Sequence, residues 1–265
     1  MVSRKRKASD PDCSGETSQK CEAPSVLEER KLVIPRAGSH ITLKCLAEAS
    51  SNAPGPGLFG VAGRLWPAGR LLAEVLAQPK ALGPDWQQRL QDPLRCLEIG
   101  AGTALPSLCL SLLGHECVAT DLPIALAVTR ANVAANGLNV ATAALALGDT
   151  SAAQRPMPTA RSARSAASHF DLVLAADVCY DPVLYHPLLQ TLRALQFDWL
   201  LIAVVQRADL GEETFENFCQ DEEFPLRMLH TAMPPAAAGA AAHRVNIYEA
   251  KGEDLGSRGD ARQKK

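Results

Sequence analysis

The chain lacks the features that would mark a secreted or membrane protein. No apolar run approaches the roughly 18 residues that a membrane helix needs, and the amino-terminal segment M-V-S-R-K-R-K lacks the apolar core of a secretion signal. The 27 basic and 29 acidic residues give a net charge of −2, which offers no general attraction to nucleic acid or to an anionic membrane. We therefore expect a soluble cytoplasmic protein without a membrane or a direct nucleic-acid partner.

Cysteine and histidine are present without the spacing that metal sites or disulfide frameworks need. The eight cysteines include no C-x-x-C pair, and several lie inside apolar runs, where cysteine behaves as a small hydrophobic residue. The six histidines are scattered, with no pair at the spacing of helical metal ligands. We expect reduced thiols and no metal ion.

The two ends of the chain differ in composition from its centre. Residues 1–30 are rich in Ser, Lys, Glu and Pro and poor in large apolar groups, so burial cannot offset the entropy of ordering them. We expect disordered tails over residues 1–30 and 251–265. The basic run at residues 4–7 allows a nuclear location beside the cytoplasmic one, although short basic runs also occur at simple solvated termini.

Between the tails, the sequence divides into an N-terminal extension over residues 31–80 and a core over residues 81–250. Alternating apolar residues predict a hairpin over residues 31–46, and the spacing in W-P-A-G-R-L-L-A-E-V-L-A predicts a helix over residues 66–77. In the core, strands and helices alternate, which is typical of an α/β fold with a mostly parallel sheet and helices on both faces. The expected strands are residues 94–99, 116–120, 141–147, 171–176, 198–205, 224–230 and 243–249, and the expected helices are residues 104–113, 123–136, 182–195 and 212–220.

Two segments of the core depart from this alternation. Residues 150–168 carry three arginines and few large apolar groups, which predicts a mobile loop. The last two of the seven strands are joined by a loop containing P-P-A-A-A-G-A-A-A, which leaves no room for an ordinary crossover helix. We therefore expect these two strands to pair antiparallel at one edge of the sheet.

The run C-L-E-I-G-A-G-T-A couples a strand to a glycine turn, and the next strand, E-C-V-A-T-D, ends in Asp121. Gly100 and Gly102 have no Cβ, so the backbone can turn tightly and approach a ligand, while Asp121 offers an acceptor for ribose hydroxyls. A dinucleotide site would need a third glycine where this chain has Leu105, so the turn does not match the dinucleotide motif. The acid Glu98 lies two residues before Gly100. Such glycines and acids also occur in turns without ligands, but the order of strand, turn, helix, strand and acid favours a nucleoside site.

A second motif narrows the prediction. Residues 170–182 read F-D-L-V-L-A-A-D-V-C-Y-D-P and place Asp177 and Tyr180 directly after the expected fourth strand. Together with G-A-G-T-A, with Asp121 and with W-P before a helix, this segment resembles the seven-strand protein-lysine methyltransferases of family 16. That group includes the methyltransferase-like 21 enzymes and the valosin-containing-protein lysine methyltransferase. The resemblance covers about residues 58–250, and the D-x-x-Y motif of the family begins at Asp177.

The resemblance implies a Rossmann-like class I methyltransferase fold, S-adenosylmethionine (AdoMet) as the cofactor, and methyl transfer to a lysine side chain of a non-histone protein. By the same resemblance, the protein substrate would be a chaperone, an AAA ATPase or a translation factor, and we expect the enzyme to be a monomer. Asp177 and Tyr180 would line the channel in which the lysine meets the methyl group. The positions that would contact the cofactor are Trp66, Glu98, Gly100, Gly102, Asp121, Leu147 and Ala176.

The sequence departs from the family at two positions. Leu147 stands where the family usually has a tryptophan that packs on the adenine, and Ala104 stands where the family has the last glycine of G-A-G-T-G. Leucine can still cover an adenine face, with less area and without ring stacking. These departures bear on the strength of AdoMet binding rather than on the fold.

Two other functions stay open on the sequence alone. A class I methyltransferase could act on another acceptor, such as a small molecule, a histidine or a nucleic acid, although the N-P-P-Y type of motif found in many nucleic-acid methylating enzymes is absent at residues 177–180. The other is a non-catalytic interaction module, favoured by the missing adenine tryptophan and the alanine-rich loops. Asp177 and Tyr180 could likewise serve only to cap and pack the start of the next helix.

Overall fold

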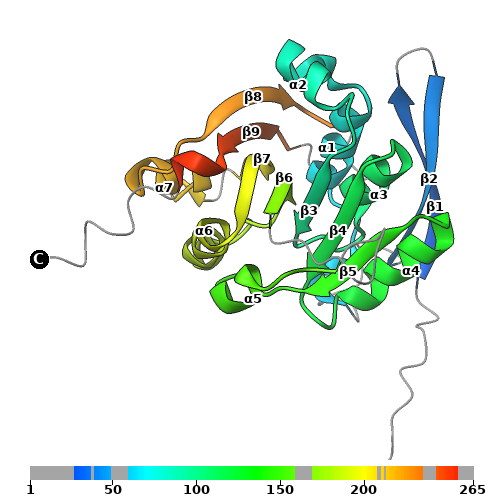
Figure 1. The fold of residues 1–265 in the computed structure, drawn as a ribbon, viewed down its shortest axis with the longest axis horizontal. Coiled ribbons are helices and arrows are strands. Elements are labelled where there is room, and N and C mark those ends of the chain that lie inside the picture. The colour runs from blue at the N-terminus through cyan, green and yellow to red at the C-terminus, as the bar shows by residue number, and fades with distance from the viewer. Residues whose placement is uncertain are drawn as a thin grey trace, which may run out of the picture.

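The computed structural model describes residues 27–36, 39–48, 59–158, 169–207, 210–211, 213–234 and 243–255. Its centre is a seven-stranded sheet in the order β5-β4-β3-β6-β7-β9-β8 (Figure 1). The strands are β3 (Arg95–Ile99), β4 (Glu116–Asp121), β5 (Val140–Ala144), β6 (His169–Ala176), β7 (Gln196–Val205), β8 (Arg227–Ala232) and β9 (Val245–Lys251).

Five neighbouring strands of this sheet are parallel. β5, β4, β3, β6 and β7 pair in parallel, whereas β9 pairs antiparallel with both β7 and β8. The predicted mostly parallel sheet, with its last two strands antiparallel at one edge, is confirmed. The carboxyl ends of β3, β4 and β6 therefore meet at one edge of the sheet, where ligands of α/β proteins bind.

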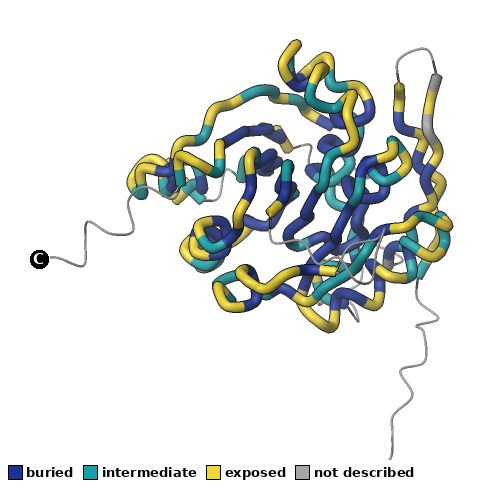
Figure 2. Tube along the Cα trace, viewed as in Figure 1, coloured by how far each residue is buried: buried dark blue, intermediate teal, exposed yellow. Residues whose placement is uncertain are grey.

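Helices cover both faces of the sheet, which confirms the predicted layers. The helices are α1 (Pro67–Ala77), α2 (Pro84–Arg89), α3 (Leu105–Leu112), α4 (Leu126–Asn136), α5 (Thr150–Gln154), α6 (Tyr185–Ala194) and α7 (Phe215–Asp221). Successive residues of β6 belong to two different apolar clusters: Leu172 packs with Leu72 of α1, and Val173 packs with Leu188 of α6. Figure 2 shows the resulting band of buried strands in the middle of the molecule.

The N-terminal extension contains a separate two-stranded antiparallel sheet, which confirms the predicted hairpin. The sheet begins at Leu27, so the prediction of a disordered tail is wrong for residues 27–30, which pair with β2. Its strands are β1 (Leu27–Arg36) and β2 (Ser39–Glu48). Ile34 and Leu43 are buried in the same apolar cluster as α1 and α3. The edge of β2 docks on α4, where the Asn132 side chain hydrogen-bonds both the N–H and the C=O of Leu46.

The segment predicted as a loop over residues 150–168 begins with α5 instead. The Asp149 carboxylate caps this helix by accepting a hydrogen bond of 2.9 Å from the Ala152 N–H. A capping acid supplies the partner that a first-turn N–H otherwise lacks, so a short helix forms in a segment with few apolar residues. Residues 159–168 of the predicted loop lie outside the described residues.

Ordered structure also continues beyond residue 251, where the predicted tail begins. Lys251 still pairs with Trp199 of β7, and a 3-10 turn follows at Gly252–Asp254. The remainder of this tail and the whole of residues 1–26, with the basic run, lie outside the described residues. None of the helices in the described part of the chain is long and apolar enough to cross a membrane.

Candidate active site

The turn between β3 and α3 has the left-handed backbone that its glycines predict. The φ angle is +61° at Gly100, +48° at Gly102 and +58° at Ala104. A Cβ at Gly100 would lie 2.5 Å from Val178 Cγ1, and a Cβ at Gly102 would lie 2.9 Å from the Ala62 carbonyl oxygen. Both glycines are therefore required by the packing of the protein on itself, before any ligand is considered.

Asp121 lies directly beside this turn, as predicted. Its Oδ2 accepts a hydrogen bond of 2.7 Å from the Gly102 N–H, and its Oδ1 accepts one of 2.7 Å from the Leu122 N–H. Burial raises the pKa of this carboxyl, while the two backbone donors act in the opposite direction. Because a carboxylate can accept about four hydrogen bonds, Asp121 retains acceptor capacity for a pair of ribose hydroxyls.

Glu98 lies under the turn rather than in an open site. Its side chain is 2% exposed, and Oε2 accepts a hydrogen bond of 2.9 Å from the Ser107 N–H in the first turn of α3. Burial raises the pKa of Glu98 to about 8. The visible role of Glu98 is to tie β3 to the start of α3, and its predicted cofactor contact stays a prediction.

Trp66 and Ala176 approach the same edge from two elements. Trp66 is the N-cap residue of α1, and its indole Nε1 donates a hydrogen bond of 2.8 Å to the Val61 carbonyl. One helical turn further, Gly69 packs on the end of β6. A Cβ at Gly69 would lie 4.0 Å from Ala176 Cβ. The small residues at both contact points let α1 lie close over the carboxyl end of β6.

Leu147 lies three residues beyond the end of β5, and not inside a strand over residues 141–147 as predicted. The chain leaves the sheet because Ala146 and Asp149 form a turn, in which Asp149 N–H donates to the Ala146 carbonyl. The Leu145 N–H donates a hydrogen bond of 3.0 Å to the Asp121 carbonyl, which holds this loop at the end of β4. Leu147 itself is partly buried and packs on the apolar cluster that contains α6.

Asp177 follows β6 in a left-handed conformation with φ +55°. Its N–H donates a hydrogen bond of 2.9 Å to the Ala203 carbonyl of β7, and its side chain is 3% exposed. Both carboxylate oxygens are taken by Arg207, at 2.9 Å from Nη1 to Oδ1 and 3.0 Å from Nη2 to Oδ2. The predicted channel residue is therefore one half of a nearly buried ion pair.

Tyr180 is the accessible member of the D-x-x-Y motif, with 37% of its surface exposed. Partial burial raises the pKa of its hydroxyl, and the carboxylates of Asp181, Asp121 and Asp177 raise that pKa further. These three acids belong to the loop after β6 and to the end of β4, so the motif and the glycine turn share one edge of the sheet. Asp181, directly after the motif, accepts a hydrogen bond of 3.0 Å from the Val183 N–H, so the capping role considered above for Asp177 belongs to Asp181 instead.

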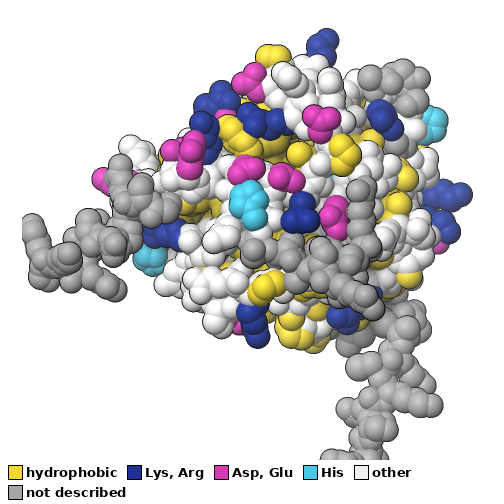
Figure 3. All heavy atoms as spheres, in the orientation of Figure 1, with side chains coloured by type: hydrophobic (Ala, Val, Ile, Leu, Met, Phe, Trp, Pro, Cys, Tyr) yellow, Lys and Arg dark blue, Asp and Glu magenta, His cyan; other side chains and the backbone are white. Residues whose placement is uncertain are grey.

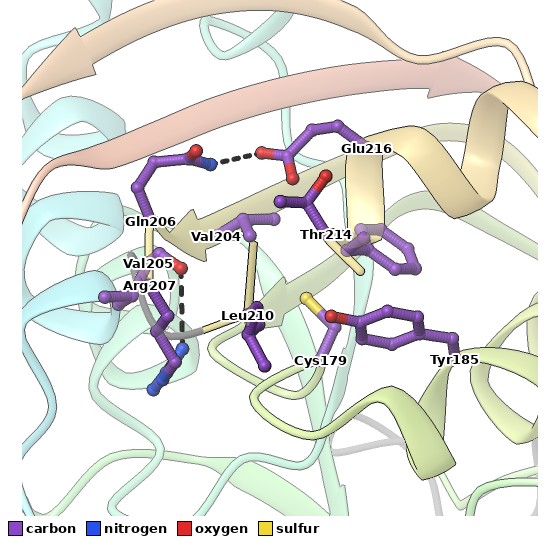
Figure 4. Close-up of a pocket in the computed structure, with 10 residues that line it drawn as sticks. Cys179, Tyr185, Val204, Val205, Gln206, Arg207, Leu210, Thr214 and Glu216 are labelled. Atoms are coloured by element: carbon purple, nitrogen blue, oxygen red, sulfur yellow. Dashed lines mark hydrogen bonds between the residues drawn. The ribbon is translucent and has the colours of Figure 1, made fainter. Parts of the chain in front are cut away.

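A small pocket lies between the end of β7 and the start of α7 (Figure 4). Arg207 and Cys179 line it from the ends of β7 and β6, and Glu216 lines it from α7. Glu216 Oε1 accepts hydrogen bonds from the Gln206 amide and, at 2.7 Å, from the Tyr248 hydroxyl. Arg207 and Glu216 were not among the residues predicted from the sequence. The available signal was the pair Q-R directly after a buried strand that ends at the ligand-binding edge.

One group in the described residues has metal-ligating side chains within reach of one another. His169, Asp171 and Asp198 lie at the amino ends of β6 and β7, with potential ligand atoms within 4.8 Å of one another. His169 pairs with Asp198 at 3.2 Å, and Asp171 accepts a hydrogen bond from the Arg95 N–H. This group lies at the opposite end of the strands from Asp121 and takes no part in the site.

Comparison with known proteins finds a matching family profile, a similar mouse protein and several similar solved structures. A family profile described as lysine methyltransferase matches residues 56–221. The mouse protein EEF1A lysine methyltransferase 3 is 29% identical over 206 residues, which cover 76% of this chain and 77% of that protein. Among solved structures, the Thermus thermophilus 16S rRNA N2 G1207 methyltransferase, in complex with AdoMet and guanosine, has a TM-score of 0.47 at 19% identity, over 86% of this chain and 52% of that one. The Synechocystis magnesium protoporphyrin IX methyltransferase has a TM-score of 0.46 at 14% identity, over 69% and 83% of the two chains.

The family match spans well over half of the chain, including the glycine turn, Asp121 and the D-x-x-Y motif. It confirms the resemblance drawn from those motifs, together with AdoMet as the cofactor and a protein as the substrate. The chain belongs to the lysine methyltransferase family and is an AdoMet-dependent protein-lysine N-methyltransferase.

Proposed function

We propose that methyl transfer takes place at the carboxyl ends of β3, β4 and β6, on a lysine of a non-histone protein. The observation that supports this place most is the hydrogen bond from the Gly102 N–H to Asp121. It joins the glycine turn to the strand-end acid, one strand away from Asp177 and Tyr180. Asp121 at the end of β4 and the D-x-x-Y motif after β6 thus lie on either side of β3, which carries the glycine turn.

The residues around the turn fit AdoMet in chemistry. The free acceptor capacity of Asp121 suits the two ribose hydroxyls, and the backbone of Gly100 and Gly102 suits the methionine part. Trp66 and Leu147 supply apolar surface from α1 and from the loop after β5. When bound, AdoMet supplies a methyl group that is activated by a positively charged sulfur.

The protein has to deliver a neutral amine to that methyl group, because a protonated lysine has no electron pair to donate. The substrate ammonium first gives a proton to water. With AdoMet held at the glycine turn, the amine nitrogen would form a bond to the methyl carbon as the carbon–sulfur bond breaks. The electron pair of that bond would go to sulfur, and a methylated ammonium would result. Such a reaction needs little covalent help, so most of the acceleration comes from positioning the amine.

Tyr180 is suited to hold the amine in line. The raised pKa keeps its hydroxyl protonated at neutral pH, so the group both donates and accepts hydrogen bonds. Its half-exposed ring also offers a face to the cationic side chain as it enters. We assign Tyr180 the direct contact with the substrate lysine and Asp177 a place behind it.

The name of the mouse relative, rather than the surface of this protein, suggests which substrate to test. The mouse relative is named for methylation of EEF1A, so EEF1A is the first protein to test. Figure 3 shows basic and acidic side chains interspersed on the face in view, without the single-sign field that nucleic-acid binding favours. A cytoplasmic enzyme, with the nucleus as the alternative location, is consistent with such a substrate.

The test is transfer of tritium from labelled AdoMet to recombinant unmethylated EEF1A and, in parallel, to a lysate of cells that lack the enzyme. We expect Tyr180→Ala to lower the transfer rate at least about a hundredfold, the order of loss for a misplaced reactant, with AdoMet affinity changed less than a few-fold. Tyr180→Phe should cost less, because it keeps the ring.

The matched control is Val183→Ala, since Val183 is 71% exposed and three residues from Tyr180. It should leave both transfer and AdoMet affinity unchanged. Full transfer by Tyr180→Ala would contradict the assigned site. Labelling of a lysate protein but not of EEF1A would retain the site and reject EEF1A as the substrate.

A further inference from the structure

The ion pair between Asp177 and Arg207 is the feature of the site that the sequence motifs do not explain. Arg207 comes from the end of β7 and Asp177 from the end of β6, and they form two parallel hydrogen bonds of 2.9 Å and 3.0 Å. The side chains are 19% and 3% exposed. Bidentate pairing of this kind fixes the plane of a carboxylate and uses its most accessible lone pairs.

The backbone at Asp177 is held in an unusual conformation by the same surroundings. A non-glycine residue at φ +55° costs about 1–2 kcal/mol, so the structure around it has to supply the difference. The hydrogen bond from its N–H to the Ala203 carbonyl and the pair with Arg207 both come from β7. Backbone strain of this type is typical of functional sites, where it aims a side chain in one direction.

The pairing changes what Asp177 can do for an incoming lysine. A free carboxylate within about 4–6 Å of an ammonium raises the pKa of that ammonium by roughly 1–3 units, which favours the unreactive protonated form. A carboxylate already neutralised by a guanidinium has much less effect. The other charged groups near this place are the carboxylates of Asp121, Asp181 and Glu216.

We propose that Arg207 is a positioning residue for methyl transfer, which neutralises Asp177 so that the substrate lysine can lose its proton beside Tyr180. This inference rests on the proposed function, because it takes the lysine to enter next to the D-x-x-Y motif. Arg207 acts through Asp177 and does not touch the methyl group. The pocket lined by Arg207 and Glu216 is the space beside this pair (Figure 4).

The pH dependence of transfer separates this role from a merely structural one. The assay measures initial rates of tritium transfer from AdoMet to EEF1A, or to whichever lysate protein the wild-type enzyme labels. The rates are measured between about pH 6.5 and 9.5, the range in which deprotonation of the lysine should change the rate. In Arg207→Gln, the unpaired Asp177 carboxylate should raise the pKa of the substrate lysine. The acid limb of the rate profile should therefore move to higher pH by about one unit, the lower end of the usual effect of a nearby charge. The variant would then be about tenfold slower below the limb and approach the wild-type rate at high pH.

Two further variants make the test specific to charge. Arg207→Lys keeps the positive charge without the bidentate geometry and should leave the limb near its wild-type position. The double variant Asp177→Asn with Arg207→Gln removes both charges and should return the limb to wild type, and asparagine tolerates the left-handed backbone at position 177. The affinity for AdoMet, measured by calorimetry, should stay within a few-fold of wild type in all three.

The outcomes are distinct from those that test the proposed function. An equal loss of rate at every pH in both Arg207→Gln and Arg207→Lys would overturn the inference and leave the transfer site intact. If Arg207→Gln fails to fold, because it leaves a buried charge unpaired, the double variant and Asp177→Asn decide. Asp177→Asn alone should move the limb down, and an unmoved limb would overturn the inference. A wild-type enzyme that labels no protein would contradict the proposed function itself.

Discussion

Asp121 joins two features that the sequence shows nineteen positions apart, and it does so with hydrogen bonds to the Gly102 and Leu122 N–H groups. Asp121→Ala should weaken AdoMet binding by about 1.5–3 kcal/mol, the range for a hydrogen bond to a charged group. Calorimetric titration with AdoMet measures the effect. Asp121→Asn is the matched control, since it keeps one acceptor oxygen and should lose less. An unchanged dissociation constant in Asp121→Ala would remove this residue from the cofactor site.

Glu98 makes the stability of the fold depend on pH. Its ordinary pKa is 4.5, and burial raises the pKa in the folded protein to about 8, so the folded form binds more protons between these values. Stability contributed by the protonated side chain is fully present below pH 4.5 and is lost as the pH rises through about 8.

Glu98→Gln should therefore flatten the pH dependence of the unfolding free energy over that window, because glutamine does not titrate. Urea unfolding at pH 6 and at pH 8.5 measures the slope for wild type and variant. Equal slopes in the two proteins would show that Glu98 is ionised in the folded state.

The packing around Gly100 shows how far single residues could be predicted. The glycines were expected to leave room for a ligand, and the structure shows that Val178 and Ala62 occupy the space that their side chains would need. Gly100→Arg would thus disturb Val178 as well as AdoMet. The spacing of a motif identifies which residue lacks a side chain, but not which neighbour fills the space.

Two asparagines of α4 hold the hairpin against this helix. Their side chains hydrogen-bond the backbone of β2, as a neighbouring strand would. The Asn132 side chain hydrogen-bonds the N–H and C=O of Leu46. The Asn136 side chain hydrogen-bonds the N–H and C=O of Lys44, both at 2.8 Å. Asn132 is 0% exposed, and its two hydrogen bonds to Leu46 are partly buried.

Asn132→Leu should destabilise the protein by about 1–3 kcal/mol, because the Leu46 polar groups lose a buried partner. Denaturant unfolding measures the loss, and hydrogen exchange at the Leu46 amide should become faster. Asn136→Ala, at a half-buried position, is the milder control. Unchanged protection at Leu46 would mean that the hairpin does not depend on this docking.

Most helices and strands could be predicted because their apolar pattern extends over many residues. Strands β6 and β7 contain continuous apolar runs at residues 172–176 and 200–205, as expected of strands with both faces covered. The short α5 could not be predicted from periodicity, since its formation depends on the Asp149 cap. The end of β5 at Ala144 also escaped prediction, because apolar residues continue past it in A-L-A-L.

The assembled sheet explains why the place of the site could be predicted and its pairing could not. Residues after β3, β4 and β6 meet because parallel strands end at one edge, whatever their distance in sequence. The link from Asp177 to Arg207 spans thirty positions and two strands, and no local spacing encodes it. A charged residue that follows a buried parallel strand at this edge is therefore worth testing as a site residue in its own right.

The central claim is that this fold carries methyl groups from AdoMet to the side-chain nitrogen of protein lysines. The most direct measurement is incubation of the wild-type enzyme with tritiated AdoMet and a lysate of cells that lack it, followed by amino-acid analysis of the labelled protein and mass spectrometry of its peptides. We expect label in methylated lysine, lost in Tyr180→Ala and retained in Val183→Ala. Label in histidine, in RNA or in a small molecule, or no transfer by an enzyme that binds AdoMet, would contradict it.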